Sequence, residues 1–533
     1  MNQDFFRTTA HARSFKVALL ALLVLIAAEA AAILFLNSGF FIFTLDDPYI
    51  HLALAENLRL GHYGVNLTEY SAPSSSILWP LLLIPVAGTA VADYYILIFN
   101  TLLSAGSLFV CFKLLSPLDP GAKSVGLTVM LLLLIPALNL VGILFTGMEH
   151  SLQLFLSLLI VAGLIHEMRT GNADRWLYAA IVLAPLVRYE CLALSFPALL
   201  FLFLRRHRIG AVAAGVGIVA TISAFALYLQ SLGLNPFPTS VMAKSGIVGS
   251  GGRLGSFAGN LLIALQSPRG ILLCIAATML LFVVLDPERR REQRLFAISI
   301  MAAIGAHLIA GQYGWYSRYE IYIWAAAIMS LLWLHQGRLW AFFARFGRIR
   351  AGLVAASAVS LICAPYIYAT LSTPIAATNI YEQHYQMHRF ATEFYSEPLA
   401  VNDLGYVSYR NHNYILDLGG LASAEALKFR LSASDDEWMD RLATERGIKF
   451  AMIYDEWFPA IPANWIKLGE LNLSRTKITP AAASVSFYAL DCNELPRLSE
   501  SLERFTQSLP ARVVFERSQP ATDPCNQSLP LPR

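Results

Sequence analysis

The amino-acid sequence predicts a polytopic α-helical membrane protein of about 11 crossings, followed by a soluble α/β domain. Of its 533 residues, 56% are hydrophobic and only 14% are charged, and the mean hydropathy is +0.54. Ten apolar runs approach or exceed the length of a bilayer crossing. After about residue 372, charged residues, Pro and Asn recur and the apolar runs become short. We therefore expect a transmembrane domain over residues 1–372 and a soluble domain over 373–533.

The predicted crossings follow the apolar runs in chain order. Twenty apolar positions at 17–36 favour a retained anchor over a cleaved signal peptide. The run at 77–112 contains two prolines and Asp93, and we expect one crossing with a bent entry segment. The run at 177–204 contains "RYE" at 188–190, which predicts two short helices meeting at a charged elbow. The runs lie at 17–36, 77–112, 125–145, 150–166, 177–204, 211–232, 270–285, 295–312, 319–335 and 350–370.

Lys and Arg are distributed unevenly over the connecting loops. With a cytoplasmic N-terminus, the inner loops hold 18 Lys and Arg residues and the outer loops hold 6. The positive-inside rule then places loop 37–76 and the C-terminal domain on the outer side of the membrane, which for a bacterial inner membrane is the periplasmic side. The net charge of +3 is too small to indicate a nucleic-acid partner, and no basic run is interleaved with aromatic residues.

The C-terminal part alternates short β-like runs with polar helix-like stretches. "PLAVND", "NYILDL" and "IKFAMIYD" are typical of strands, and "DDEWMDRLATERG" is typical of a helix. Cys492 and Cys525 lie in this part and could form a disulfide worth roughly 3 to 4 kcal/mol if it faces an oxidising compartment. The sequence does not show that the two cysteines are close.

The stretch "FTLDDPYIHLALAENL" at 43–58 contains an acidic pair, Asp46 and Asp47. Asp47 followed by Pro48 predicts a helix start with Asp47 as N-cap, and Gly61 predicts its end. Asp46 then has no capping role, and it lies beside a like charge. We therefore expect Asp46 to serve at an external pocket at the membrane edge, where a carboxylate can take the proton of a hydroxyl acceptor.

Three cationic residues fall at external helix ends in this topology: Arg188, Lys244 and Arg318. Converging cations would bind the phosphate of a lipid-linked substrate, because charge-assisted contacts are strongest where water is scarce. Each also has a structural alternative. Arg188 would pair with Glu190, Lys244 would extend its ammonium group to the membrane surface, and Arg318 would pair with Glu320.

The stretch "DDPYIHLALAENLRLGHYGVNLTEYSAPSSSILWPLLL" resembles the first external loop of bacterial GT-C glycosyltransferases, in particular the arabinofuranosyltransferase-like group. Shorter matches follow in order: "TGMEH", "VRYE", "NPFPTSVMAKSG" and "AVNDLGYVSYRNHNYILDLGGLAS". The chain departs from the family pattern at "YSAPSSS" and at Tyr189, where the family has proline. In the first stretch the matching positions are Asp46, Asp47, Tyr49, Ile50, Asn57, Leu58, Gly61, Gly64, Leu78 and Trp79.

The resemblance implies a transferase that moves a sugar, such as arabinofuranose or another pentose, from a polyprenyl-phosphate donor to an envelope glycan or glycolipid. It implies that Asp46 is the catalytic base and that Asp47 supports it or binds a divalent cation with it. Metal dependence varies in the family and stays open. The substrate-binding residues that it implies are Tyr49, Glu149, Arg188, Glu190, Lys244 and Arg318.

Two other classes of protein remain as alternatives. A transporter or flippase of lipid-linked glycans would place charges along its crossings and show inverted repeats, whereas here the charges gather at one face. An envelope assembly scaffold would work through its C-terminal domain and would tolerate Asp46→Asn.

Overall fold

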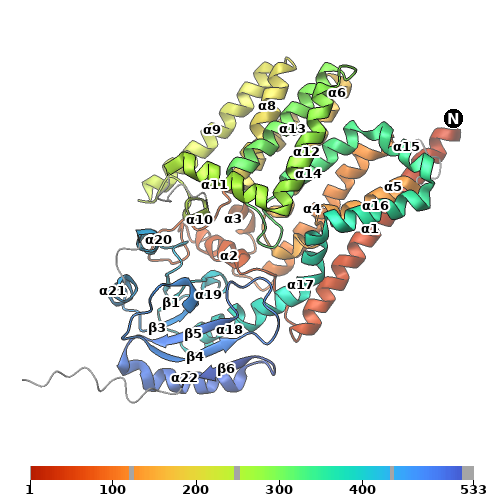
Figure 1. The fold of residues 1–533 in the computed structure, drawn as a ribbon. Helices are drawn as coiled ribbons and strands as arrows, with labels where there is room; N and C mark the ends of the chain where they lie inside the picture. The colour runs from red at the N-terminus through yellow and green to blue at the C-terminus, as the bar shows by residue number, and fades with distance from the viewer. Residues whose placement is uncertain (1, 119–124, 245–251, 433–436, 519–533) are drawn as a thin grey trace, which may run out of the picture.

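The computed structural model describes residues 2–118, 125–244, 252–432 and 437–518. Figure 1 shows a bundle of helices with a small β-sheet at one end and helix α2 between the two parts. The chain is a many-span helical membrane protein with a C-terminal mixed α/β region. The predicted fold class is confirmed at this level.

Six helices among the described residues are long and apolar enough to cross a bilayer. A seventh candidate, α16 with α17 and its continuation, is bent by 73°, as in a broken span or a re-entrant loop. Pro365 at the start of α17 explains the bend, because proline cannot continue the hydrogen bonding of a preceding helix. Four shorter apolar helices occupy the other predicted positions. The helices of this part are α1 (Asn2–Leu36), α3 (Leu78–Leu83), α4 (Ala92–Leu115), α5 (Val125–Ala137), α6 (His150–Thr170), α7 (Arg175–Val187), α8 (Leu192–Leu204), α9 (Arg208–Ser231), α12 (Pro268–Leu285), α13 (Arg291–Ala310), α14 (Ile321–Leu334), α16 (Arg348–Ile362) and α17 (Ala364–Glu382).

The elbow predicted within 177–204 is present. Helix α7 ends at Val187, Arg188 is extended with φ −153° and ψ 132°, and a single turn over Tyr189–Cys191 leads into α8. The elbow therefore places Arg188 between two helices rather than within one.

Three helices lie in segments that we expected to be loops: α10 (Thr239–Lys244), α11 (Gly252–Gln266) and α15 (Gln336–Phe346). α11 packs against α12 and α13. Polar residues interrupt these sequences, so their average hydropathy stays below that of a crossing although one face of each is apolar.

The C-terminal sheet has the strand order β2-β1-β3-β5-β4-β6. The strands β2, β1 and β3 are parallel, with Val401 opposite Asp417 and Met452, and the other neighbours are antiparallel. The strands are β1 (Leu399–Val401), β2 (Ile415–Asp417), β3 (Phe450–Ile453), β4 (Ile466–Asn472), β5 (Ser484–Ala489) and β6 (Val514–Arg517). The helices around them are α18 (His384–Arg389), α19 (Gly405–Ser408), α20 (Ala424–Ser432), α21 (Trp438–Glu445) and α22 (Leu495–Ser508).

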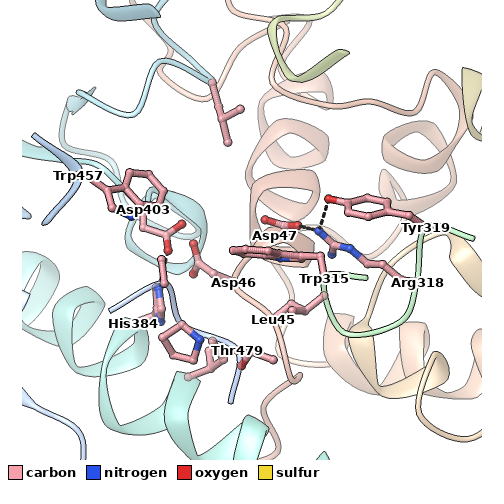
Figure 2. A pocket seen from close by; sticks show the side chains of 14 residues that line it. Leu45, Asp46, Asp47, Trp315, Arg318, Tyr319, His384, Asp403, Trp457 and Thr479 are labelled. Atoms are coloured by element: carbon pink, nitrogen blue, oxygen red, sulfur yellow. Dashed lines mark hydrogen bonds and ion pairs between the residues drawn. The ribbon is translucent and has the colours of Figure 1, made fainter. Parts of the chain in front are cut away.

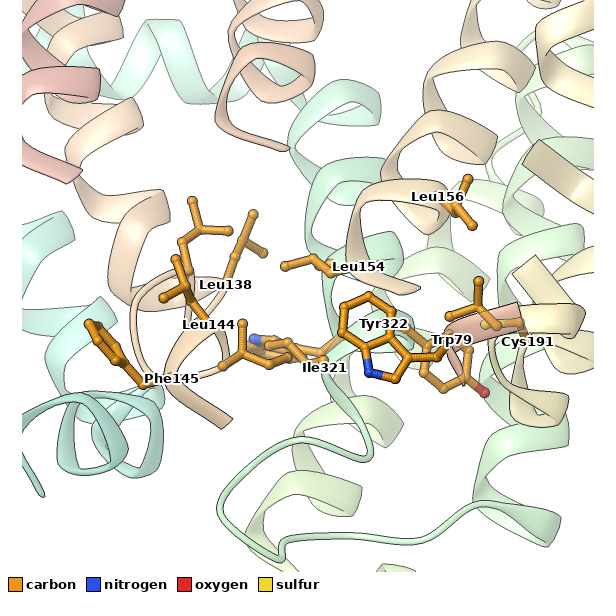
Figure 3. Close-up of a cluster of buried hydrophobic side chains, with 14 of the residues drawn as sticks. Trp79, Leu138, Leu144, Phe145, Leu154, Leu156, Cys191, Ile321 and Tyr322 are labelled. Atoms are coloured by element: carbon orange, nitrogen blue, oxygen red, sulfur yellow. The ribbon is translucent and has the colours of Figure 1, made fainter. Parts of the chain in front are cut away.

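Helix α2 (Asp47–Leu58) joins the two parts. Nine of its 12 residues are buried, the half-buried ones being Asp47, Glu56 and Leu58. It contacts α3 on one side and α19 on the other, and the buried core runs without a break from the bundle (Figure 3) into the sheet. We expected this helix at the membrane edge, but it lies enclosed between the bundle and the C-terminal region.

The predicted boundary at residue 372 falls inside α17, and the first strand begins at Leu399. The predicted pairing of Cys492 with Cys525 involves a residue outside the described part of the chain. The cysteines in the apolar segments, Cys111, Cys191, Cys274 and Cys363, are free thiols.

Candidate functional site

The two aspartates at the start of α2 face different partners. We expected Asp47 to cap the helix, but Asp46 occupies the N-cap position, and its side chain makes no capping hydrogen bond. Asp46 has helical backbone angles, φ −78° and ψ −33°, whereas a capping side chain usually requires an extended residue. The predicted cap is therefore wrong, because each carboxylate binds a group from a distant part of the chain.

Asp46 is held by the backbone of α19. The N–H of Gly405 donates to Oδ2 at 2.6 Å, and the N–H of Tyr406 donates to Oδ1 at 2.7 Å. A Cβ atom on Gly405 would overlap both the backbone oxygen and the carboxylate of Asp46. Only glycine permits this close approach, which orients the carboxylate while leaving a lone pair on each oxygen.

Asp46 lies beside His384 and Asp403. The Nε2 atom of His384 is 2.9 Å from Oδ2 of Asp403, and the hydroxyl of Tyr454 is 3.1 Å from the same nitrogen. Burial raises the pKa of Asp46 to about 7; His384 opposes this shift, and the Asp403 carboxylate adds to it. A carboxyl with such a pKa can accept a proton near neutral pH.

The same three side chains could hold a metal ion. One ligand atom from each of Asp46, His384 and Asp403 lies within 4.8 Å of the other two. Two carboxylates and an imidazole suit a divalent transition metal such as Mn²⁺ or Zn²⁺, and three protein ligands leave coordination positions open. The expected pair was Asp46 with Asp47, whereas the structure brings His384 and Asp403 to Asp46.

Asp47 binds Arg318 in a salt bridge and hydrogen bond. The Arg318 side chain is 1% exposed, and its Nε and Nη1 atoms have no hydrogen-bond partner among the described residues. Because a buried donor without a partner is costly, these atoms mark a place where an anion can bind. The alternative pairing of Arg318 with Glu320 is not found: Glu320 pairs with Nε of Arg269 at 2.7 Å.

An unusual turn presents Arg318. Gly314, Trp315, Tyr316 and Ser317 have φ of 83°, 42°, 62° and 60°. The three non-glycine residues are each strained by about 1–2 kcal/mol in this left-handed conformation. Hydrogen bonds offset the strain, from Tyr316 to Ala369 O at 2.6 Å and from Arg269 to Ser317 at 2.6 Å.

These groups line one cavity of about 270 Å³. Figure 2 shows Asp46, His384 and Asp403 on one side of it and the Asp47–Arg318–Tyr319 chain on the other. Trp315 and Trp457 add aromatic walls, and 479–481 close it from the C-terminal region. The cavity therefore combines a fixed carboxylate, a cation with spare donors and apolar walls, and residues from both parts of the protein form it.

Of the other predicted site residues, Tyr49, Glu149, Arg188 and Glu190 do not line the cavity. Arg188 is fully buried and pairs with Glu149 and Glu190, each at 2.7 Å, so its alternative pairing with Glu190 is found. Tyr49 is buried against Tyr406, with ring centroids 3.9 Å apart. Lys244 ends α10, and its side chain lies outside the described part of the chain.

Sequence reasoning did not select His384 and Asp403. Asp403 lies in "AVNDLGY", within a segment that had been matched to the family but given no role. His384 carried no signal, because it comes to the site only through the packing of α18 against α19.

Residues 378–488 match the model of a domain of unknown function, DUF8728. This segment contains His384 and Asp403. No curated protein matches the chain.

Among solved structures, the chain is similar to the oligosaccharyltransferase of Archaeoglobus fulgidus. The apo form is 12% identical with a TM-score of 0.41, and the alignment covers 93% of this chain and 76% of that one. The complex of the same protein, AglB, with an inhibitory peptide and a dolichol-phosphate gives 12% identity, a TM-score of 0.39 and the same coverage. The complex with Zn and sulfate gives 12% identity, a TM-score of 0.43 and coverage of 92% and 75%. A likeness at this level carries no argument about activity.

Proposed function

We propose that this protein is a membrane glycosyltransferase of the GT-C type that moves a sugar from a polyprenyl-phosphate donor to a hydroxyl of an envelope glycan or glycolipid. The observation that supports this most directly is the shared cavity, whose lining includes both Asp46, with its fixed carboxylate, and Arg318, whose Nε and Nη1 have no hydrogen-bond partner among the described residues. The resemblance of the first external loop to this family supports the same reaction. A pentose such as arabinofuranose is the proposed sugar.

Arg318 binds the phosphate of the donor. Nη1 donates to a phosphate oxygen, beside the Nη2 that binds Asp47, and the planar guanidinium presents these donors in directions that the ammonium group of lysine does not fix. As the bond between the anomeric carbon and the phosphate oxygen breaks, the electron pair moves to the phosphate, and the guanidinium stabilises the added charge.

Asp46 accepts the proton of the attacking hydroxyl. The hydroxyl oxygen forms the new bond to the anomeric carbon, and its proton passes to the carboxylate. Gly405 and Tyr406 hold that carboxylate from behind. Such a positioned base contributes typically 10²–10⁴-fold in rate.

The charges in the cavity favour a bound cation. Asp46, Asp47 and Asp403 face it together with Arg318, and the donor phosphate adds a further negative charge. A divalent cation on Asp46, His384 and Asp403 would neutralise part of this charge when bound.

The orientation completes the proposal: the cavity faces the outer side of a bacterial inner membrane, where the loop charges place it. Arg188, Glu149 and Glu190 support the site from behind the cavity wall, and Tyr49 packs α2 against the C-terminal region.

The experiment is transfer by purified protein in liposomes, with polyprenyl-phosphate pentoses and hexoses as donors and envelope glycolipid extract as acceptor. We expect Asp46→Asn to abolish transfer while the protein stays folded. Asp417→Asn is the matched control, because Asp417 is equally buried and also accepts two backbone N–H bonds, at 2.8 and 2.6 Å, but does not line the cavity. Substantial transfer by Asp46→Asn, or equal loss in both variants, contradicts the proposed role of Asp46.

A further inference from the structure

We infer that Tyr319 and Arg188 are positioning residues, which hold the Arg318 guanidinium in the orientation that binds the donor phosphate. This inference rests on the proposed function. The sequence had suggested Arg188 as a direct phosphate ligand. Here Arg188 instead acts through Tyr319, which lines the cavity.

The ring of Tyr319 is shared by two guanidinium groups. The Cζ atom of Arg318 lies 5.1 Å from the ring centroid, and the Cζ atom of Arg188 lies 5.6 Å from it. Nη2 of Arg318 also donates to the Tyr319 hydroxyl at 3.3 Å. Tyr319 and Arg318 line the cavity, whereas Arg188 does not. The ring is therefore in contact range of two cations, and the cation–π attraction of each helps to fix the ring in place.

Hydrogen bonds to two glutamates hold Arg188 in a fixed position beside the Tyr319 ring. Its Nη1 donates to Glu149 Oε1 at 2.7 Å, and its Nη2 and Nε donate to the two oxygens of Glu190 at 2.7 and 3.2 Å. The Arg188 side chain is 1% exposed, and Glu149 is fully buried. These charge-assisted bonds make Arg188 a fixed support against the ring of Tyr319.

The contacts of Arg188 lead back to helix α2, which carries Asp47. His51 and Asp47 are four residues apart and share one face of this helix. The Nε2 atom of His51 lies 3.6 Å from Glu149 Oε2, while Asp47 binds Arg318. The resulting closed network runs through Asp47, Arg318, Tyr319, Arg188, Glu149 and His51, and it leads back to α2.

The network explains which donors of Arg318 remain available. Asp47 and the Tyr319 hydroxyl both bind Nη2. Nε and Nη1 have no partner among the described residues. Arg188 and Arg318 are both positively charged, and their repulsion also disfavours rotation of Arg318 toward Glu149 and Glu190. Arg318 is thereby left with two donors for an anion.

The test measures binding of farnesyl phosphate, a short polyprenyl phosphate, to the full-length protein in detergent. We expect Tyr319→Leu to weaken binding about tenfold, because both cation–π contacts are lost, and Tyr319→Phe to weaken it only about two- to threefold, because the ring remains. Arg188→Lys keeps the charge but not the planar fork, and it should fall between them.

The matched control is Tyr322→Phe. Tyr322 is fully buried and donates a hydrogen bond to Glu190 O at 2.9 Å, but among the described residues it neither lines the cavity nor forms a hydrogen bond with Arg318. We expect it to lower the melting temperature as much as Tyr319→Phe does and to leave farnesyl phosphate affinity unchanged.

The outcomes separate this inference from the proposed function. Wild-type affinity in both Tyr319 variants, with binding lost in Arg318→Gln, overturns the positioning role and leaves the phosphate site standing. Equal weakening in Tyr322→Phe also overturns it, because the effect would then be one of general stability. Unchanged binding in Arg318→Gln contradicts the phosphate site itself.

Discussion

Asp46 and Gly405 are 359 positions apart in the chain, yet the backbone N–H of Gly405 donates a 2.6 Å hydrogen bond to the Asp46 carboxylate. This bond, with its neighbour from Tyr406, ties the start of α2 to the C-terminal region. The orientation of the proposed base therefore depends on a backbone that follows the first strand of the sheet.

Gly405→Ala should displace Asp46, because a methyl group at this position overlaps the aspartate. We expect transfer to fall about 10²-fold, the usual effect of a shift of roughly 1 Å at a reacting group. Gly217→Ala is the control: nothing lies within 4 Å of its added Cβ, and alanine there should be neutral or slightly stabilising. Full activity in Gly405→Ala would show that the contact does not position the base.

Arg318→Lys should raise the KM for the donor by about 10- to 100-fold, the equivalent of one charged hydrogen bond of roughly 1.5–3 kcal/mol. The ammonium group keeps the charge but not the planar pair of donors. Steady-state kinetics with varied donor concentration check this, with acceptor KM as the internal reference. An effect confined to the acceptor KM would place Arg318 at the other substrate.

His384→Ala and Asp403→Asn should lower the metal content of protein purified with Mn²⁺ or Zn²⁺, because each removes one of three ligands. Elemental analysis after gel filtration measures it. Asp417→Asn again serves as the control carboxylate outside the cavity. Metal content that is equal in all variants would exclude the three residues as ligands.

If the protein stays active after EDTA treatment, its rate of sugar transfer should rise as the pH increases through about 7. Because burial raises the pKa of Asp46 to about 7, its carboxyl is mostly protonated below that pH. A protonated carboxyl cannot accept a proton, so the rate should increase as Asp46 ionises. A pH–rate profile measures this. A rate that is constant from about pH 5.5 to about pH 8.5 would exclude a base with this pKa.

The orientation is tested by cysteine labelling of intact cells with a membrane-impermeant maleimide. Thr68→Cys, at an exposed position of segment 37–76, should react at once. Glu288→Cys, exposed in the basic loop at 286–294, should react only after the membrane is opened. The reverse pattern would place the cavity in the cytoplasm and remove the proposed reaction from the outer face.

The sequence predicted the positions of the apolar helices and the charged elbow, because hydropathy acts locally. It predicted about 11 crossings, whereas six helices of the described residues, or seven with the bent pair, are long and apolar enough to cross. α11 and α15 were missed because their apolar residues cover one face only. The acidic pair was selected because a helix start needs only one capping carboxylate, and the sequence has two. His384 and Asp403 were not selected, because only tertiary packing brings residues 338 and 357 positions further along the chain to Asp46.

The cavity receives walls from Leu45 at one end of the chain and Pro480 near the other. A polypeptide whose synthesis stops before residue 479 contains every one of the apolar helices but lacks residues 479–481, which close the cavity. Under the proposed function, we expect transfer only from chains that have been extended past this point.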